Sequence, residues 1–203
     1  MTCILVMGTP RSGTSAIAGA LNHMRIPMGK FFTVPNEGNP KGFWEDNNFV
    51  NINVALLASE LSHPQLRLRT STFRQARKLL EERQAEYALW GVKDPRFCFT
   101  FPLYAVLLGD DLKVILTLRD IEHTALSMNR LFSVGVKRTT ATIEGYKEAI
   151  NYSLEGYTGP RLDVQFDDLM GDPASELQRI AEFVDVPLTD AAIAFIDPSM
   201  RHW

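Results

Sequence analysis

Residues 3–15 read CILVMGTPRSGTS, and this stretch decides the expected fold. The apolar run 3–8 is typical of a buried parallel strand that ends at Gly8. From Gly13 onward, apolar residues recur at helical spacing, at Ile17, Leu21 and Met24. A strand, a tight turn and a helix therefore follow one another directly, as they do at the start of a βαβ unit.

Strands and helices are expected to alternate along the rest of the chain. Short apolar or alternating runs predict strands at 88–93, 113–118 and 162–166. Helical spacing predicts helices over 50–61, 67–86, 121–131 and 143–157, and from Pro173 onward. This alternation predicts one α/β domain over 1–203, with a mainly parallel sheet flanked by helices. Ligands of such folds bind beyond the carboxyl ends of strands, here after Met7, Lys93 and Leu118.

The composition excludes several classes of protein. Of the 203 residues, 45% are hydrophobic and 22% are charged, which is ordinary for a globular chain and unlike a disordered or fibrous one. A net charge of -3 argues against a general nucleic-acid binder. Two cysteines, Cys3 and Cys98, are too few for a disulfide framework or a zinc site. Since no signal peptide or membrane span is expected either, a cytoplasmic setting is predicted, with the oligomeric state left open.

The turn after the first predicted strand has the features of an anion site. Residues 8–15 match G-x-x-x-x-G, but Thr14 stands where a nucleotide triphosphatase carries its lysine. Backbone N–H groups and the following helix N-terminus attract an anion, and Arg11 adds a positive charge. Thr14 and Ser15 add hydroxyl donors. The alternative is a glycine- and serine-rich turn that only caps the helix.

Two separated motifs resemble those of the sulfotransferases that use 3′-phosphoadenosine 5′-phosphosulfate (PAPS). Residues 10–15, PRSGTS, resemble the family's 5′-phosphosulfate loop. Arg119 and Ser127, eight positions apart, match the pair that holds the 3′-phosphate in that family. Residues 91–96, GVKDPR, and the region 166–184 also resemble family segments, in the expected order along the chain.

The sequence also departs from the cytosolic members of that family. Ala16 replaces the tryptophan that commonly stacks on adenine, and Asp94 follows Lys93 where a catalytic histidine is common. The usual Arg-Lys-Gly near the C-terminus is absent, and only Arg201 and His202 could substitute for it. The pattern is closer to bacterial and carbohydrate-type sulfotransferases, which can use a carboxylate base.

The resemblance implies a role for individual residues. The donor would be bound by the phosphate loop, the 3′-phosphate pair and the C-terminus, through Arg11, Ser12, Gly13, Thr14, Ser15, Arg119, Ser127 and Arg201. Lys93 and Arg11 would stabilise charge during transfer, without a metal. Glu45 is the preferred base, at the end of a loop, 29–46, that is expected to form a substrate lid. Glu37 and Asp46 are alternative bases, and Glu45 has an alternative role as a helix cap.

These expectations combine into one predicted activity. The chain would transfer a sulfuryl group from PAPS to a hydroxyl or amine of a small molecule, sugar or lipid. Aromatic residues in and beside the lid loop would line the acceptor pocket or form a plain hydrophobic cluster: Phe31, Phe32, Phe43 and Trp44. The alternatives are a P-loop kinase or nucleotide triphosphatase, and a non-catalytic protein that binds PAPS or its product, adenosine 3′,5′-bisphosphate (PAP).

Overall fold

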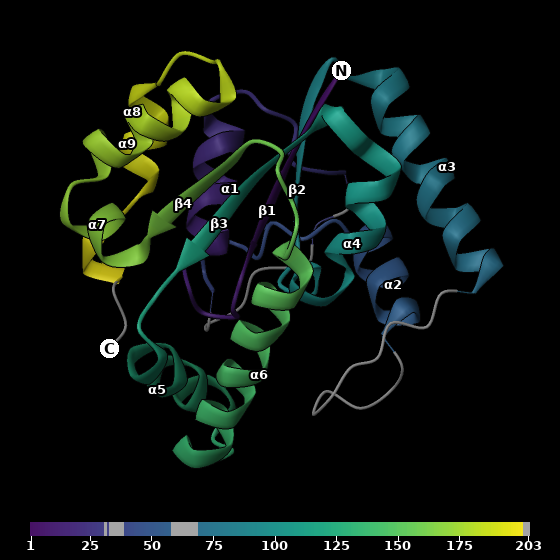
Figure 1. Ribbon diagram of the computed structural model, residues 1–203. Helices are drawn as coiled ribbons and strands as arrows, with labels where there is room; N and C mark the ends of the chain where they lie inside the picture. Colours follow the sequence, from purple (N-terminus) through teal and green to yellow (C-terminus); the bar gives the residue numbers. More distant parts are fainter. Residues whose placement is uncertain (31, 33–38, 58–68, 201–203) are drawn as a thin grey trace.

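Four parallel strands form the centre of the molecule. The computed structural model describes residues 1–30, 32, 39–57 and 69–200. Its strands are β1 (Thr2–Gly8), β2 (Leu89–Lys93), β3 (Leu112–Leu118) and β4 (Arg161–Gln165). They form one sheet in the order β2-β1-β3-β4, and every neighbouring pair is parallel (Figure 1). The predicted parallel α/β architecture is therefore confirmed.

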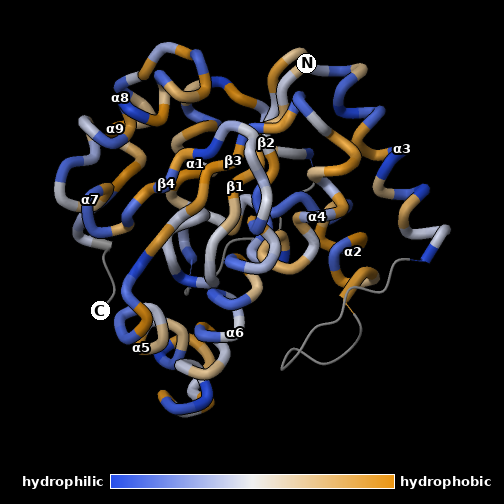
Figure 2. The backbone as a smooth tube through the Cα atoms, in the orientation of Figure 1, coloured by the Kyte–Doolittle hydropathy of each residue, from blue (hydrophilic) through white to orange (hydrophobic). Residues whose placement is uncertain are grey.

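Helices cover both faces of this sheet, because β1 is apolar on both sides (Figure 2). Its odd-numbered residues pack with α2 (Asn47–Leu56), α3 (Thr70–Glu86), α4 (Phe97–Leu108) and α6 (Val136–Leu154). Its even-numbered residues pack with α1 (Thr14–His23), α7 (Phe166–Gly171), α8 (Pro173–Val184) and α9 (Asp190–Phe195). Two hydrophobic cores result, one on each face, as continuous apolar strands require.

The remaining helix, α5 (Ile121–Phe132), lies with part of α6 beyond the carboxyl ends of the strands (Figure 1). Two short 3₁₀ helices complete the described elements, at Gly109–Asp111 and Pro198–Met200. The chain runs from β1 to β2 on one side and later to β3 on the other side. The turn after β1 therefore lies where the strand order reverses, which is the usual ligand position in open α/β sheets.

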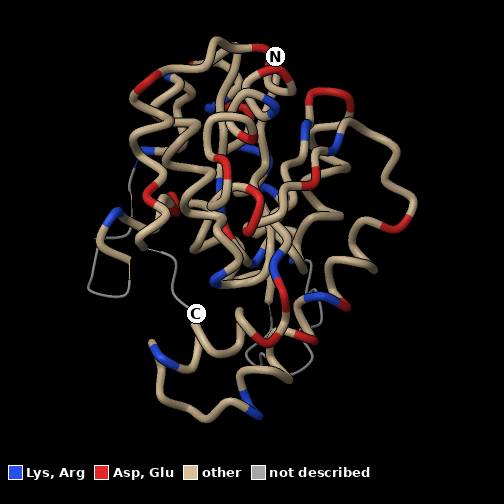
Figure 3. Tube along the Cα trace, turned by 90° about the vertical axis from the view of Figure 1, so that its left-hand side faces the viewer, with Lys and Arg blue, Asp and Glu red and all other residues tan. Residues whose placement is uncertain are grey.

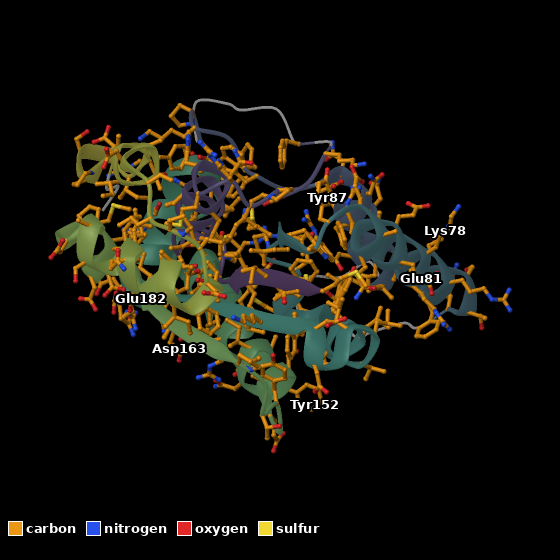
Figure 4. All side chains as sticks on the ribbon, turned by 90° about the horizontal axis from the view of Figure 1, so that it is seen from above. Lys78, Glu81, Tyr87, Tyr152, Asp163 and Glu182 are labelled. Carbon is orange, nitrogen blue, oxygen red and sulfur yellow. The ribbon has the colours of Figure 1, made fainter. Side chains whose placement is uncertain are left out.

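Several element boundaries differ from the prediction. The helix expected at 143–157 begins earlier, at Val136, and ends at Leu154. The helix expected over 50–61 spans Asn47–Leu56, and residues 58–61 lie outside the described part of the chain. The sequence did not predict α4, α7 or α9. The charged face expected on 67–86 is confirmed over α3, where Lys78 and Glu81 point outward (Figure 4).

Acidic and basic residues are interspersed along the described part of the trace in the view of Figure 3. Cys3 and Cys98 are both buried and free, as expected. Among the described helices, none is long and apolar enough to cross a membrane. Over the same residues, no group of three or more His, Cys, Asp or Glu side chains could hold a metal ion.

Candidate functional site

A single cavity joins the predicted motifs at the carboxyl end of the sheet. The described residues enclose about 420 Å³ there. The cavity is lined by the turn after β1, the end of β2, the start of the β3–α5 connection and the inner sides of α5 and α6. Its polar lining includes Arg11, Thr14, Ser15, Glu45, Lys93, Arg96, Arg119 and Ser127. Residues distant in sequence thus meet in one place.

The turn after β1 takes a conformation that glycine and local hydrogen bonds make possible. Gly13 has φ 97° and precedes the first turn of α1, so backbone N–H groups of this helix face the cavity end of the loop. Arg11 also has a left-handed backbone, with φ 70°. Ser12 is fully buried, and its hydroxyl donates to the Thr9 carbonyl at 2.7 Å and pairs with Thr117 Oγ1 at 2.7 Å. The structure therefore places Ser12 outside the cavity lining, where it holds the loop in shape.

Replacing Gly13 by alanine is expected to damage this loop. A Cβ at Gly13 would lie 2.6 Å from Phe166 Cδ2, and the positive φ would strain any other residue. We expect a loss of about 1–3 kcal/mol in the free energy of unfolding, together with weaker anion binding. Denaturant unfolding and calorimetry with PAP measure these effects. Gly145→Ala is the control, since a Cβ there meets no atom within 4 Å; equal effects of both variants would contradict the prediction.

Arg119 and Ser127 lie together beside the loop, as their spacing predicted. Arg119 directly follows β3, and its Nη1 donates to the Arg11 carbonyl at 3.0 Å. The guanidinium carbon lies 4.2 Å from the centre of the Phe166 ring, which fixes the plane of the group by a cation–π contact. Ser127, on α5, accepts a hydrogen bond from Arg11 Nε at 3.2 Å. Arg11 thereby connects the two predicted anion motifs.

Lys93 and Glu45 form a mostly buried ion pair inside the cavity. Lys93 is the last residue of β2, and its Nζ lies 2.7 Å from Glu45 Oε1. The two side chains are 3% and 13% exposed. Lys93 also donates to the Phe43 carbonyl at 3.1 Å and to Ser15 Oγ at 3.3 Å. The loop has Thr14 where a nucleotide triphosphatase has a lysine, and Lys93 at the end of β2 supplies an ammonium group beside the loop instead.

The neighbouring carboxylate, Asp46, has a different position. Asp46 is fully buried; its Oδ2 pairs with Arg83 Nη2 at 2.7 Å, and its Oδ1 accepts from the backbone N–H of Asn48. Asp46, not Glu45, is thus the residue that caps α2. Asp46 does not line the cavity, and both of its carboxylate oxygens already have partners among the described residues. It is therefore a poor candidate for the base. Glu37 lies outside the described residues.

Arg96 enters the cavity beside Glu45, a placement that the sequence analysis missed. Its Nη1 lies 2.9 Å from Asp94 Oδ1 and 3.7 Å from Glu45 Oε2. Asp94 is fully buried, and burial raises the pKa of its carboxyl group. Asn53 donates to Asp94 Oδ2 at 2.9 Å and anchors this carboxylate further. The signal lay in the segment GVKDPR itself, whose last residue was not assigned a role.

The predicted aromatic lining is divided between two places. Phe43 lines the cavity, whereas Trp44 does not; Trp44 packs edge-on against Phe32 and against Phe195, which itself lines the cavity. Tyr146, on α6, also lines the cavity, although the sequence pattern indicated only a buried helix face. Phe31 and Arg201 lie outside the described residues, as does part of the expected lid loop.

Comparisons with known proteins identify the family and the fold of the chain. The model of the sulfotransferase family matches residues 3–190. Among solved structures, the sulfotransferase domain of the Synechococcus PCC 7002 olefin synthase has a TM-score of 0.61 at 19% identity, covering 98% of this chain and 79% of that one. The sulfotransferase STF1 of Mycobacterium tuberculosis H37Rv has a TM-score of 0.62 at 18% identity, with coverages of 98% and 71%. The sulfotransferase domain from the curacin biosynthetic pathway has a TM-score of 0.60 at 16% identity, with coverages of 98% and 85%.

These structural likenesses, at such low identity, concern the fold. No curated protein matches the chain. The family model, in contrast, spans nearly the whole sequence, including the phosphate loop, Lys93 and the Arg119–Ser127 pair. The chain is therefore a member of the sulfotransferase family.

Proposed function

We propose that the protein transfers a sulfuryl group from PAPS to a hydroxyl or amine of a small-molecule, sugar or lipid acceptor. One observation carries this proposal: a single cavity is lined by the phosphate loop, by Arg119 and Ser127, and by the Lys93–Glu45 pair. The donor has two phosphate-type groups, and each requires an anion-binding group of the protein. The acceptor hydroxyl requires a base and a cation close to the reacting atoms.

The residues present fit the donor at both of its charged ends. Loop N–H groups, Thr14, Ser15 and Arg11 would hold the 5′-phosphosulfate. Arg119 and Ser127 would hold the 3′-phosphate, and Phe166 keeps the Arg119 guanidinium in place. Burial lowers the pKa of Arg11, so its charge carries a desolvation cost that an anionic ligand would offset.

Bound PAPS would supply an activated sulfuryl group with PAP as its leaving group. Glu45 would accept the proton of the acceptor hydroxyl as its oxygen approaches in line. Lys93, 2.7 Å from Glu45, would hydrogen-bond the bridging oxygen on which negative charge develops. Arg11 would neutralise charge on the transferring group, and Asp94 would hold Arg96 beside the base.

Calorimetry with PAP, with and without Mg²⁺, tests the donor assignment. We expect binding of PAP in the absence of Mg²⁺, followed by transfer of labelled sulfuryl groups in an acceptor screen with PAPS. Adenosine triphosphate with Mg²⁺ is the comparison ligand. Tight binding of that ligand with no response to PAP would favour a P-loop kinase or triphosphatase. Binding of PAP without transfer to any acceptor class would favour a non-catalytic binding protein.

Arg119→Ala is expected to weaken PAP binding selectively. The loss should be about 1.5–3 kcal/mol larger for PAP than for adenosine 5′-phosphate, which lacks the 3′-phosphate. A smaller loss should be common to both ligands, since Arg119 also holds the Arg11 carbonyl. Calorimetry with both ligands measures the difference, and Arg161→Ala, on the edge strand β4, is the control. Equal losses for the two ligands would show that Arg119 only supports the loop.

A further inference from the structure

One part of the cavity lining is apolar, and on α5 it directly follows Ser127. It is formed by the inner sides of α5 and α6 together with Phe43 and Pro95, through Met128, Leu131, Phe132 and Tyr146. The other half contains Arg11, Arg119 and Ser127, which the donor would occupy. If the proposed donor position is correct, the apolar half is where the acceptor must lie to reach Glu45.

The charged side chains beside this apolar half already form ion pairs with one another. Arg96 lies between Asp94 at 2.9 Å and Glu45 at 3.7 Å, and Lys93 lies 2.7 Å from Glu45. The Asp94 carboxylate is fully buried and fixed by Asn53, so it holds the Arg96 guanidinium in place. A negative group next to the acceptor hydroxyl would therefore be repelled by Glu45. The two nearby cations, Lys93 and Arg96, are already paired with Glu45 and Asp94 and would not compensate this repulsion. The inner part of this subsite favours an uncharged acceptor.

Tyr146 supplies a polar group in this apolar surrounding. The side chain is 8% exposed, and its ring packs edge-on against Phe99 with centroids 4.7 Å apart. No hydrogen bond between described residues involves its hydroxyl, and its oxygen is not among the fully buried atoms that lack a partner. Burial is the main cause that raises the pKa of this phenol, so it stays a protonated donor at neutral pH. A hydroxyl that lines a cavity and has no hydrogen-bond partner among the described residues is suited to bind a ligand.

We propose that the α5–α6 half of the cavity is the acceptor subsite, which takes an alcohol with an apolar body and no charge near its hydroxyl, and that Tyr146 positions that hydroxyl. The inference rests on the proposed sulfuryl transfer and deepens it. Tyr146 would donate a hydrogen bond to the oxygen of the acceptor alcohol, and Glu45 would accept the proton of that alcohol. The two contacts together would fix the orientation of the acceptor hydroxyl.

The size of the cavity and its rim extend the argument to the acceptor body. A volume of about 420 Å³ is near the lower limit of pockets that enclose one drug-sized ligand, so little of the described cavity is left to enclose an acceptor beside the donor. The acceptor body would then extend to the α5–α6 turn, where Phe132 lines the cavity and where Phe132, Val134 and Val136 are exposed. Arg130 and Lys137 are exposed there too, so the restriction on charge concerns only the part of the acceptor beside Glu45.

Acceptor series with labelled PAPS test the class of acceptor. From ethanol through 1-butanol to 1-octanol, kcat/KM should rise by up to about fourfold for each methylene that leaves water. The isosteric pair 4-methyl-2-pentanol and 3-hydroxybutyrate tests charge beside the hydroxyl, and the neutral alcohol should be preferred at least tenfold. Independence of chain length, or preference for 3-hydroxybutyrate, would overturn the proposal.

Tyr146→Phe tests the positioning role while it keeps the ring against Phe99. We expect kcat/KM for 1-octanol to fall about threefold to tenfold, the effect of one neutral hydrogen bond, with an unchanged Kd for PAP. Tyr152→Phe is the matched control, because Tyr152 is 77% exposed on the same helix and points away from the sheet (Figure 4). Equal results for the two variants would remove Tyr146 from the subsite.

Phe132→Ser tests the rim without disturbing a core, since Phe132 is more than half exposed. The ratio of kcat/KM for 1-octanol to that for 1-butanol should fall, whereas Val106→Ser, at an exposed apolar residue on α4, should leave the ratio unchanged.

Calorimetry with PAP distinguishes a failure of the proposed function from a failure of the proposed acceptor class. Failure to bind PAP refutes the proposed function, and PAP binding without transfer to any alcohol of the series refutes the acceptor class.

Discussion

Glu45→Gln is expected to lower kcat by about 10²- to 10⁴-fold, the usual contribution of a general base. Glutamine keeps the shape of the side chain and an oxygen that can accept from Lys93, but it cannot take a proton from the acceptor. The carboxylate is 13% exposed and lies in the cavity beside Lys93 and Arg96, whereas Asp197, the other carboxylate of the described lining, accepts from the Ser199 hydroxyl. Steady-state kinetics with labelled PAPS measures the loss. The Kd of PAP, from calorimetry, should change little.

Asp46→Asn is the matched control for this variant, one position along the chain. Its carboxylate pairs with buried Arg83, so the variant should lose about 3 kcal/mol in the free energy of unfolding. Its kcat, measured well below the unfolding transition, should stay within a few-fold of the unchanged enzyme. If Asp46→Asn abolished turnover and Glu45→Gln did not, the assignment of the base would be wrong.

The fold could be predicted because its strongest signals are local. Apolar runs such as 3–8 and 113–118 indicate buried parallel strands without any tertiary information. The helix α4 was not predicted, because it is apolar on nearly all sides and therefore lacks the periodicity of a half-exposed helix. The helices α7 and α9 have six residues each, which is too short for a periodic pattern to develop.

The meeting of the residues of the proposed donor site was easier to predict than the arrangement of the proposed acceptor site. Arg11, Lys93 and Arg119 each follow or end a strand, and parallel strands bring their carboxyl ends together at one edge. The acceptor half depends on how α5 and α6 pack beyond that edge, which no spacing in the sequence reports. Tyr146 occupies a regular position on the apolar face of α6, so its pattern is that of any core residue.

Neighbouring residues with the same chemistry also needed the structure. Glu45 and Asp46 are adjacent carboxylates, and both suited either a base or a helix cap by sequence. Only the backbone direction at the start of α2 decides that Asp46 caps the helix and Glu45 faces the cavity. Likewise, Ser12 and Ser15 are both loop hydroxyls, yet Ser12 bonds within the loop while Ser15 lines the cavity.

Lys93→Met is expected to lower kcat by about 10²- to 10³-fold, the cost of removing one donor that stabilises charge in the transition state. Methionine fills a similar volume but leaves Glu45 without the ammonium group 2.7 Å away. The free energy of unfolding should therefore fall as well, by up to about 3 kcal/mol, since breaking a buried pair leaves one charge uncompensated. Kinetics and denaturant unfolding must be measured together to separate these two effects.

The double variant Lys93→Met/Glu45→Gln makes that separation. Neutralising Glu45 removes the uncompensated charge, so the double variant should regain part of the stability that Lys93→Met loses. Its kcat should nevertheless stay at or below that of either single variant, because both groups act in the same transfer step and their losses are not additive. If the kcat of the double variant equals that of Glu45→Gln, Lys93 acts only by holding Glu45 in place. A kcat clearly below that of Glu45→Gln would instead support Lys93 as a group that contacts the transferring donor.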